Sequence, residues 1–508
     1  MSRLRSENIP ARGKGLVRVS TGVEGLDDVL GGGLPRSRLY LVEGDPGTGK
    51  TTLALQFLLH GREREEPVLY VTLSETKDEL RDVADSHGWS LDGVSLYELE
   101  TAHDPAADDQ EYSVFHPAEV ELGETMTRIL DQVESVNPTR VVFDSLSEMR
   151  LLAQGPLRYR REILALKQFF AGRKCTVLLL DDRTAQENDL QLQSISHGVI
   201  RLERVNTDYG VTRRRLHVVK MRGVRFRDGY HDYVIDTGGI AVFPRLVASE
   251  HPGNHVREKG SGGLARLDEL LGGGLERGSS SLILGPAGSG KSTLATQFAW
   301  AACNRGERVW WAMFEENRDT FVERSSGMSL NVDSFLEQGL LQLEQVDPGE
   351  LSPGEFVAHV RRAIELDGIR MVVIDSLNGY LNAMPNEKYL LLQLHELLTY
   401  LAQRGVMTIL IVAQHGLMGR MDTPLELSYL ADTVLLLRYF EAEGEVRQAL
   451  SVVKKRKGGH ERTIRELRFA NDGIHIGEPL REFAGVLTGV PRFVGARAKL
   501  SRADDGES

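Results

Sequence analysis

Short apolar runs alternate with amphipathic stretches in both halves of this chain. The runs span residues 38–44, 67–73, 140–146 and 176–181 in the first half, and 281–285, 308–314, 370–377 and 408–414 in the second. Runs of this length predict buried strands, and the helical spacing in 52–60 and 293–301 predicts helices. Strands that alternate with helices indicate an α/β fold, in which a mostly parallel central sheet is flanked by helices and joined by right-handed crossovers.

The pattern is present twice, with a shift of 241 positions. The segment STGVEGLDDVLGGGL begins at Ser20, and SGGLARLDELLGGGL begins at Ser261. A repeat of this length indicates two duplicated domains, because it is too long for a solenoid repeat. The predicted organisation is a first domain over 15–246, a linker over 247–260, a second domain over 261–479 and a C-terminal tail over 480–508 whose end is disordered.

Each half contains a phosphate-binding loop between a predicted strand and a predicted helix. The loops are GDPGTGKT at 44–51 and GPAGSGKS at 285–292. Their glycines let backbone N–H groups turn inward and cradle phosphate oxygens at a helix N-terminus. The predicted ATP-binding residues are Gly44, Asp45, Pro46, Gly47, Thr48, Gly49, Lys50, Thr51 and Thr52, and Gly285, Pro286, Ala287, Gly288, Ser289, Gly290, Lys291, Ser292 and Thr293.

The loop lysines and the residues that follow them predict ATP and Mg²⁺ as cofactors. Lys50 and Lys291 are expected to reach the β and γ phosphates. An aspartate also ends one apolar strand in each half, where it can accept hydrogen bonds from Mg²⁺-bound water beside the loop hydroxyl. The predicted metal-site residues are Thr51 and Asp144 in the first domain, and Ser292 and Asp375 in the second.

Another strand in each half ends in acidic residues. Glu75 and Glu316 share the shift of 241 positions, whereas Ser74 occupies the position of Glu315. A carboxylate near the γ-phosphate can orient or deprotonate an attacking water or hydroxyl, and a serine cannot act as a base near neutral pH. Glu75, Glu315 and Glu316 are therefore the predicted catalytic residues, and we expect the two domains to differ in chemistry.

Composition narrows the class of protein. The formal net charge of −12 disfavours nucleic acid as a partner unless basic residues are concentrated locally, as they are at 213–215 and 454–457. The two cysteines, Cys175 and Cys303, form no Cys-x-x-Cys pair, which excludes a disulfide framework and a zinc ribbon. The longest apolar runs, such as 407–413, are too short to span a bilayer, and the N-terminus lacks a secretory signal. We expect a cytoplasmic protein with no membrane partner.

These motifs together resemble the KaiC family of double-domain RecA-like ATPases of circadian clocks. The resemblance rests on the duplicated LDxxLGGGL entrance, the phosphate loops with their TLALQF-like helices, the acidic pair, Asp-Ser-Leu, and Lys-Met-Arg-Gly at 220–223. It spans nearly the whole chain from Ser20 to Pro479. It implies two tandem RecA-like P-loop NTPase domains, a homohexamer with ATP held between neighbouring subunits, and signalling partners such as KaiB-like proteins.

The same resemblance implies a role for late basic residues. In KaiC-like proteins, cations on a late strand reach the nucleotide of the adjacent subunit, as an arginine finger does. The matching residues in this chain are Lys220, Arg222, Lys454 and Arg456. The alternative for these residues is a solvated basic edge strand that is protected by its charge from pairing.

The resemblance also implies kinase activity, in which the second domain phosphorylates an adjacent Ser-Thr pair of its own domain. In PLELSYLADT, Ser428 falls on the serine position, whereas Tyr429 departs from the threonine that a two-site cycle uses. Ser428 is therefore the candidate phosphoacceptor, with Glu315 as the general base and Glu316 supporting it. The alternative for Ser428 is a capping or packing role before the strand at 433–440.

We therefore expect a KaiC-like ATPase that autophosphorylates on serine and signals its state to partner proteins. Two other classes stay open. One is a RecA-like nucleic-acid-dependent ATPase, which the net acidity and the lack of a basic tract interleaved with aromatics disfavour. The other is a hexameric scaffold that ATP assembles and that turns over little.

Overall fold

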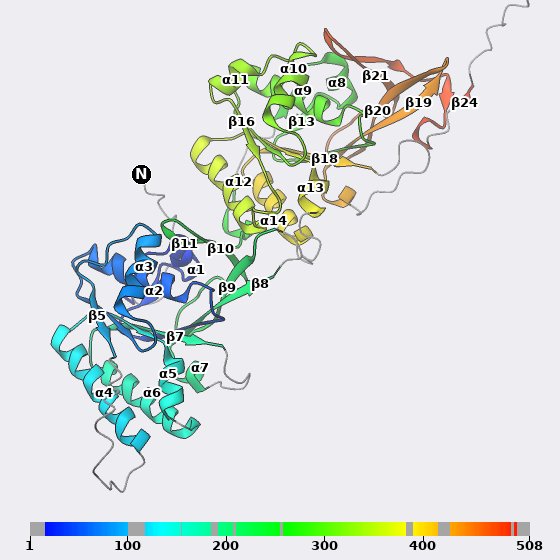
Figure 1. Cartoon of the computed structure of the whole chain (residues 1–508). Helices are drawn as coiled ribbons and strands as arrows, with labels where there is room; N and C mark the ends of the chain where they lie inside the picture. Colours follow the sequence, from blue (N-terminus) through cyan, green and yellow to red (C-terminus); the bar gives the residue numbers. More distant parts are fainter. Residues whose placement is uncertain are drawn as a thin grey trace, which may run out of the picture. The chain divides into compact units, whose positions relative to one another are not determined.

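Two units divide the chain, Met1–Arg245 and Leu246–Ser508, and each is built around one nine-stranded sheet (Figure 1). The structure is a computed structural model. It describes residues 16–99, 117–153, 155–183, 191–206, 210–253, 258–382, 390–414, 427–488 and 492–494.

Parallel strands form most of the sheet of the first unit. In spatial order they are β5 (Ser95–Glu98), β4 (Val68–Thr72), β6 (Arg140–Asp144), β7 (Thr176–Asp182), β3 (Leu39–Gly44) and β8 (Gly198–Val205). The antiparallel strands β9 (Arg213–Met221), β10 (His231–Asp236) and β11 (Gly239–Phe243) extend the sheet beyond β8. A short ladder joins β1 (Arg18–Val19) to β2 (Leu34–Pro35).

Helices cover both faces of this sheet, and each face has its own apolar core (Figure 1). One face carries α1 (Leu26–Val29), α2 (Lys50–Arg62) and α3 (Lys77–Ser86). The other carries α4 (Pro117–Val136), α5 (Leu146–Ala153), α6 (Pro156–Ala171) and α7 (Gln191–Ile195). Because both faces are covered, the inner parallel strands β3, β4, β6 and β7 are buried along almost their whole length.

The second unit repeats this architecture. Its parallel strands are, in spatial order, β16 (Leu341–Gln345), β15 (Val309–Met313), β17 (Met371–Asp375), β18 (Met407–Ala413), β14 (Ser280–Gly285) and β19 (Thr433–Ala442). The antiparallel strands are β20 (Glu445–Lys455), β21 (Ile464–Ala470) and β22 (Gly473–Pro479).

The helices of the second unit also lie on two faces. The first face carries α8 (Ala265–Leu270), α9 (Lys291–Asn304), α10 (Arg318–Ser326) and α11 (Asp333–Glu337). The second carries α12 (Pro353–Asp367), α13 (Leu377–Asn382) and α14 (Leu390–Gln403). A short ladder joins β12 (Lys259–Gly260) to β13 (Leu275–Glu276).

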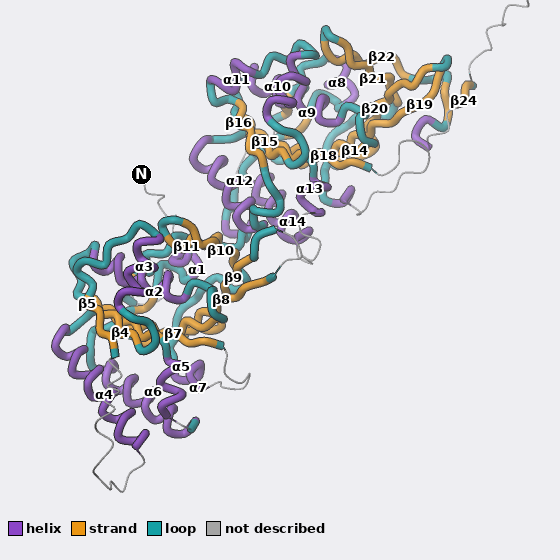
Figure 2. The backbone as a smooth tube through the Cα atoms, viewed as in Figure 1, coloured by secondary structure: helices purple, strands orange, loops and turns teal. Residues whose placement is uncertain are grey.

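The predicted fold class is confirmed. All eight apolar runs of the sequence lie in parallel strands, which Figure 2 shows in orange, and the two predicted helical stretches lie in α2 and α9. The periodicity did not predict the antiparallel strands after β8 and β19. Among those strands, β10 and β22 alternate buried and more exposed residues, β9 and β20 carry several charged residues, and the pairing of all of them depends on contacts between distant segments.

The segments predicted as linker and tail make contacts within the second unit where the structure describes them. Residues 248–250 form the turn η1, which contacts α14, and residues 259–260 form β12. In the tail, Phe483 and Val486 pack with Phe440 of β19 in a small apolar cluster. The C-terminal end, predicted to be disordered, lies outside the described residues.

Candidate functional sites

Each nucleotide site begins at a phosphate loop that turns from a central strand into a helix. The Thr48 hydroxyl donates to the carbonyl three residues earlier at 2.7 Å, and the Ser289 hydroxyl does the same at 2.9 Å. Lys50 and Lys291 begin α2 and α9, and each is 8% exposed. A buried ammonium beside the N–H groups of a helix N-terminus is suited to bind phosphate.

Glycine is required where each loop enters its helix. Gly49 has φ of 89° and Gly290 has φ of 90°, a left-handed conformation that favours glycine. A Cβ atom on Gly49 would lie 2.6 Å from Ile235 Cδ1, and one on Gly290 would lie 2.0 Å from the Phe469 ring. The antiparallel extension of each sheet therefore packs directly against the phosphate loop.

The two loop lysines differ in their contacts. Lys50 Nζ donates to the carbonyls of the first two loop residues at 2.9 and 3.2 Å and lies 2.7 Å from Asp182 Oδ1, at the end of β7. Among the described residues, Lys291 Nζ has one acceptor, the Pro286 carbonyl at 2.7 Å. Burial lowers the pKa of Lys291. The first lysine thus has a carboxylate partner that the second lacks.

Asp144 ends β6 beside the loop threonine of the first domain. Thr51 Oγ1 donates to Asp144 Oδ2 at 3.0 Å, and the Tyr70 hydroxyl donates to the same oxygen at 2.5 Å. Burial raises the pKa of Asp144, and the Tyr70 and Thr51 hydroxyls and the Lys50 ammonium oppose that rise. Two hydroxyl donors therefore orient this carboxylate.

The second domain has the same aspartate with a different neighbour. Ser292 hydrogen bonds to Asp375, and burial raises the pKa of Asp375 to about 6. Trp311 occupies the position of Tyr70, and its indole nitrogen is buried without an acceptor among the described residues. The second aspartate therefore lacks the tyrosine donor of the first.

The residues at both loops fit Mg²⁺ in the presence of nucleotide. In the described part of the chain, no group of three or more His, Cys, Asp or Glu side chains could hold a metal ion. Mg²⁺ needs no such cage, because it binds through one or two protein oxygens together with phosphate oxygens and water. A loop hydroxyl next to a strand-ending carboxylate supplies that donor set in each domain.

In the described part of the chain, no cation pairs with the predicted catalytic carboxylate of the first domain. Glu75 follows β4, and its Oε2 atom is buried without a partner among the described residues. Burial raises the pKa of Glu75 to about 7, and the carboxylates of Asp144 and Asp182 add to the rise. A carboxylate whose pKa lies near neutral pH is suited to general base catalysis.

The acidic pair of the second domain is arranged differently. Arg324 of α10 binds Glu316 through both carboxylate oxygens, at 2.9 and 2.8 Å. Glu315 instead accepts a hydrogen bond from the Ser376 hydroxyl at 2.5 Å. The residue at the position of Arg324 in the first domain is Val83, so Glu75 lacks the ion pair of Glu316.

The four predicted trans-acting cations lie far from the phosphate loops of their own domains. They are Lys220, Arg222, Lys454 and Arg456. Lys220 is opposite the second residue of β8, and Lys454 is opposite the second residue of β19. Because β8 and β19 run parallel to the strands that carry the loops, these cations lie at the opposite edge of the sheet.

The candidate phosphoacceptor lies beside two of these cations. Ser428 and Tyr429 are exposed in the turn η2 (Leu427–Tyr429), just before β19. Lys454 Nζ donates to the Ser428 carbonyl at 2.6 Å, and Arg456 Nη2 donates to the Tyr429 carbonyl at 2.7 Å. Ser428 therefore also lies at the edge opposite the phosphate loop of its own domain.

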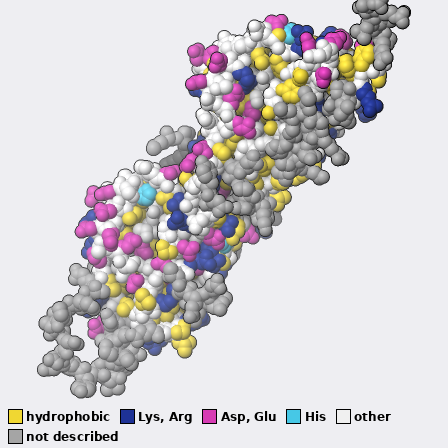
Figure 3. Space-filling view, turned by 45° about the vertical axis from the view of Figure 1, so that its right-hand side comes forward, with side chains coloured by type: hydrophobic (Ala, Val, Ile, Leu, Met, Phe, Trp, Pro, Cys, Tyr) yellow, Lys and Arg dark blue, Asp and Glu magenta, His cyan; other side chains and the backbone are white. Residues whose placement is uncertain are grey.

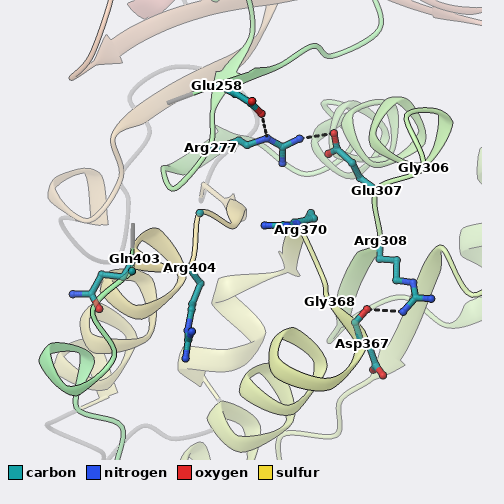
Figure 4. A pocket seen from close by; sticks show the side chains of 12 residues that line it. Glu258, Arg277, Gly306, Glu307, Arg308, Asp367, Gly368, Arg370, Gln403 and Arg404 are labelled. Atoms are coloured by element: carbon teal, nitrogen blue, oxygen red, sulfur yellow. Dashed lines mark hydrogen bonds and ion pairs between the residues drawn. The ribbon is translucent and has the colours of Figure 1, made fainter. Parts of the chain in front are cut away.

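A cavity of about 750 Å³ lies at this same edge of the second unit, away from the nucleotide site. Arg277 in its wall pairs with Glu258 at 3.3 Å and Glu307 at 2.6 Å, and Arg308 donates to the Asp367 carbonyl at 2.6 Å (Figure 4). These contacts hold together the segments that precede the parallel strands. Several charged groups of the cavity wall are thus paired with one another.

Surface charge and helix composition are relevant to the predictions about nucleic acid and membranes as partners. On the face drawn in Figure 3, acidic and basic side chains of the described residues are interspersed. None of the described helices is long and apolar enough to cross a membrane. The prediction that nucleic acid is not a partner stays a prediction.

The duplicated sheets and loops place this chain in the class of tandem P-loop ATPases with RecA-like domains. The sequence model of the KaiC ATPase family matches residues 19–247 and 261–481. The chain therefore belongs to the KaiC family of ATPases, and the predicted family is confirmed.

Curated relatives cover nearly the whole chain, and several are named circadian clock oscillator protein KaiC. The relative from Parathermosynechococcus lividus is 29% identical over 503 residues, which is 96% of this chain and 91% of the relative. The relative from Picosynechococcus sp. is 28% identical and covers 96% of this chain and 95% of its own length. The relative from Synechococcus elongatus is 28% identical and covers 99% and 97%.

Sequence reasoning missed three residues that contact the nucleotide sites. Tyr70 and Arg324 could have been found by aligning the two halves with the shift of 241 positions. In that alignment Tyr70 corresponds to Trp311, and Arg324 corresponds to Val83. Asp182 could have been noted as the aspartate that directly follows the apolar run 176–181. Neither the comparison of the halves nor the position of an aspartate after an apolar run predicts which residues these side chains contact.

Proposed function

We propose that this chain hydrolyses ATP in its first domain and, in its second domain, transfers the γ-phosphoryl group of ATP to Ser428 of a neighbouring copy. The position of Ser428 carries the proposal. It lies beside Lys454 and Arg456, at the edge opposite its own phosphate loop. Because a strand separates the two edges by about 17–20 Å, the phosphate has to come from ATP bound by another copy.

Glu315 is the residue that we assign as the general base of this transfer. The Ser428 hydroxyl oxygen attacks the γ-phosphorus, the bond from that phosphorus to the bridging oxygen breaks, ADP leaves, and the hydroxyl proton passes to Glu315. The contacts support Glu315 over Glu316, because Glu316 is bound by Arg324 through both oxygens. We assign Glu316 the supporting role of holding Arg324.

In the first domain, we assign water as the acceptor of the γ-phosphoryl group. Glu75 is the carboxylate next to its phosphate loop and has a pKa of about 7. In both domains, bound Mg²⁺ would neutralise charge on the β and γ phosphate oxygens. Thr51 with Asp144, and Ser292 with Asp375, would hold it there.

A head-to-tail ring is the assembly that this geometry supports. The phosphate loop and the cations lie on opposite edges of one sheet, so a contact between them uses two different surfaces of the chain. Such heterologous contacts close into rings when the rotation permits. We infer a homohexamer with ATP at its subunit contacts, as the resemblance to KaiC implies. We also infer that partner proteins, such as KaiB-like proteins, recognise its phosphorylation state.

Incubation of the full chain with Mg²⁺-ATP, followed by phosphopeptide mapping, tests this proposal. We expect phosphate on Ser428, none in Ser428→Ala, and wild-type amounts in Tyr429→Phe. Glu315→Gln should reduce incorporation by about 100-fold, the usual contribution of a general base, with ATP binding retained. Steady ADP release without phosphoprotein would leave an ATPase and remove the kinase assignment.

A mixing experiment tests whether the transfer occurs between copies. Lys291→Ala removes the ammonium that contacts phosphate, and Ser428→Ala removes the acceptor, so neither variant alone should become phosphorylated. A mixture of the two should place phosphate on the Lys291→Ala chain, provided that mixed rings form by subunit exchange. No phosphate on either chain in rings shown to be mixed would contradict transfer between copies.

A further inference from the structure

The ammonium of Lys50 is saturated by acceptors of its own chain. An ammonium has three N–H donors, and Lys50 Nζ has three acceptors, namely two loop carbonyls and Asp182 Oδ1. Lys50 is 9% exposed at its side chain, whereas Asp182 is 29% exposed and faces the site from β7. A phosphate oxygen that binds Lys50 therefore has to displace one of these three acceptors.

Asp182 is held in place from its other side. The Ser147 hydroxyl donates to Asp182 Oδ2 at 3.2 Å, so one carboxylate oxygen is bound by α5 and the other by the lysine. The neighbouring Asp181 pairs with Arg150 at 2.7 Å and does not contact Lys50 in the described contacts. The acid at Lys50 is thus one particular residue in a fixed position.

The second domain provides a matched site without this acid. Gly44 is paired with Asp182 between β3 and β7, and Gly285 is paired with Ala413 between β14 and β18. Ala413 therefore occupies the place of Asp182. Among the described residues, Lys291 correspondingly has one acceptor, so donors remain for phosphate.

We propose that Asp182 competes with the nucleotide phosphates for Lys50 and sets the ATP affinity of the first domain. Two effects act in the same direction. Phosphate that takes the place of Asp182 at Lys50 breaks a charge-assisted hydrogen bond, and the carboxylate stays beside the anionic phosphates, where like charges repel. The proposal rests on the proposed function in one respect, namely that the first phosphate loop binds ATP.

The test measures binding of a fluorescent ATP analogue with Mg²⁺ to the full chain, one domain at a time. First-domain binding is measured in a Lys291→Ala background. There Asp182→Ala should tighten binding by about tenfold, the size expected for loss of one competing charged contact. Asp182→Asn removes the charge but keeps a side chain that can accept from Ser147, so it should tighten binding in the same direction.

The reciprocal substitution completes the test. In a Lys50→Ala background, Ala413→Asp should weaken second-domain binding by about tenfold. Circular dichroism melting curves check that each variant folds. Unchanged or weaker first-domain binding in both Asp182 variants would overturn the inference, whereas the absence of any first-domain binding with Asp182 intact would overturn the proposed function itself.

Discussion

The two nucleotide sites share a backbone and differ in how their charges are paired. In the first domain, Lys50 is bound by Asp182, and Glu75 has no cation partner among the described residues. In the second, Arg324 binds the acidic residue at the same position as Glu75, and Lys291 has no carboxylate partner in the described contacts. The two domains therefore share the phosphate loop and differ in the ion pairs around it.

A phosphate loop that both domains share does not by itself define the chemistry of the residues next to it. A lysine with a carboxylate partner has to release it before phosphate binds, and a buried carboxylate beside other carboxylates has a raised pKa. Glu75, whose pKa is raised to about 7, is suited to act as a base near neutral pH. The domains thus have different requirements for binding and for proton transfer.

The largest expected effect concerns the base of the first domain. In a Lys291→Ala background, where the first site is left to turn over ATP, Glu75→Gln should lower ADP release by about 100-fold. The amide cannot accept the proton of water, and ATP binding should persist. A coupled assay of ADP release measures this change, and Ser74→Ala is the control that should leave the rate within about twofold.

The pH dependence of the first domain should follow Glu75. Its carboxylate accepts a proton only when ionised, so the rate should fall as the pH is lowered through about 7. At pH 6 about one tenth of the groups are ionised, and we expect a roughly tenfold lower rate than at pH 8. Steady-state ADP release in the Lys291→Ala background checks this.

A substitution can give the first domain the ion pair of the second. Val83→Arg places a cation at the position of Arg324, which should lower the pKa of Glu75. The midpoint of the pH profile should then move to lower pH by about one unit, while Val83→Leu should leave it unchanged. A midpoint that stays near 7 in Val83→Arg would show that the arginine does not account for the difference between the domains.

Substitution of Tyr70 should affect the stability of the site rather than the rate. Tyr70→Phe keeps the ring and removes the hydroxyl that donates to Asp144 at 2.5 Å, which should lower the free energy of opening of β4 and β6 by about 1.5 kcal/mol. Hydrogen exchange of peptides from these strands measures it.

Tyr40 provides the control for this loss. The hydroxyl of Tyr40 donates to the Pro35 carbonyl at 2.5 Å, a neutral acceptor, so Tyr40→Phe should cost about 1 kcal/mol. Equal exchange in Tyr70→Phe and the wild type would contradict an orienting role for Tyr70.

Most of the fold and the core of each site could be predicted from the sequence. The eight inner parallel strands contain continuous apolar runs, and the phosphate loops are contiguous in the chain, so local pattern was enough to find both. The outer parallel strands β5, β8 and β16 carry more polar residues and were not among the predicted runs. Asp144 and Asp375 followed from their place at strand ends. The antiparallel strands were not predicted, because their alternation is also compatible with exposed loops, and their register depends on distant partners.

The sequence by itself determined the duplication, the fold class and the family, and it predicted the residues that would hold Mg²⁺-ATP, because those properties depend on residues close together in the chain. Only the tertiary structure decided which charges are paired. Asp182 reaches Lys50 across 132 positions, and Ser428 lies at the edge opposite its own phosphate loop. Such contacts depend on strand order and register, which bring distant residues within the few ångströms over which ion pairs and hydrogen bonds act.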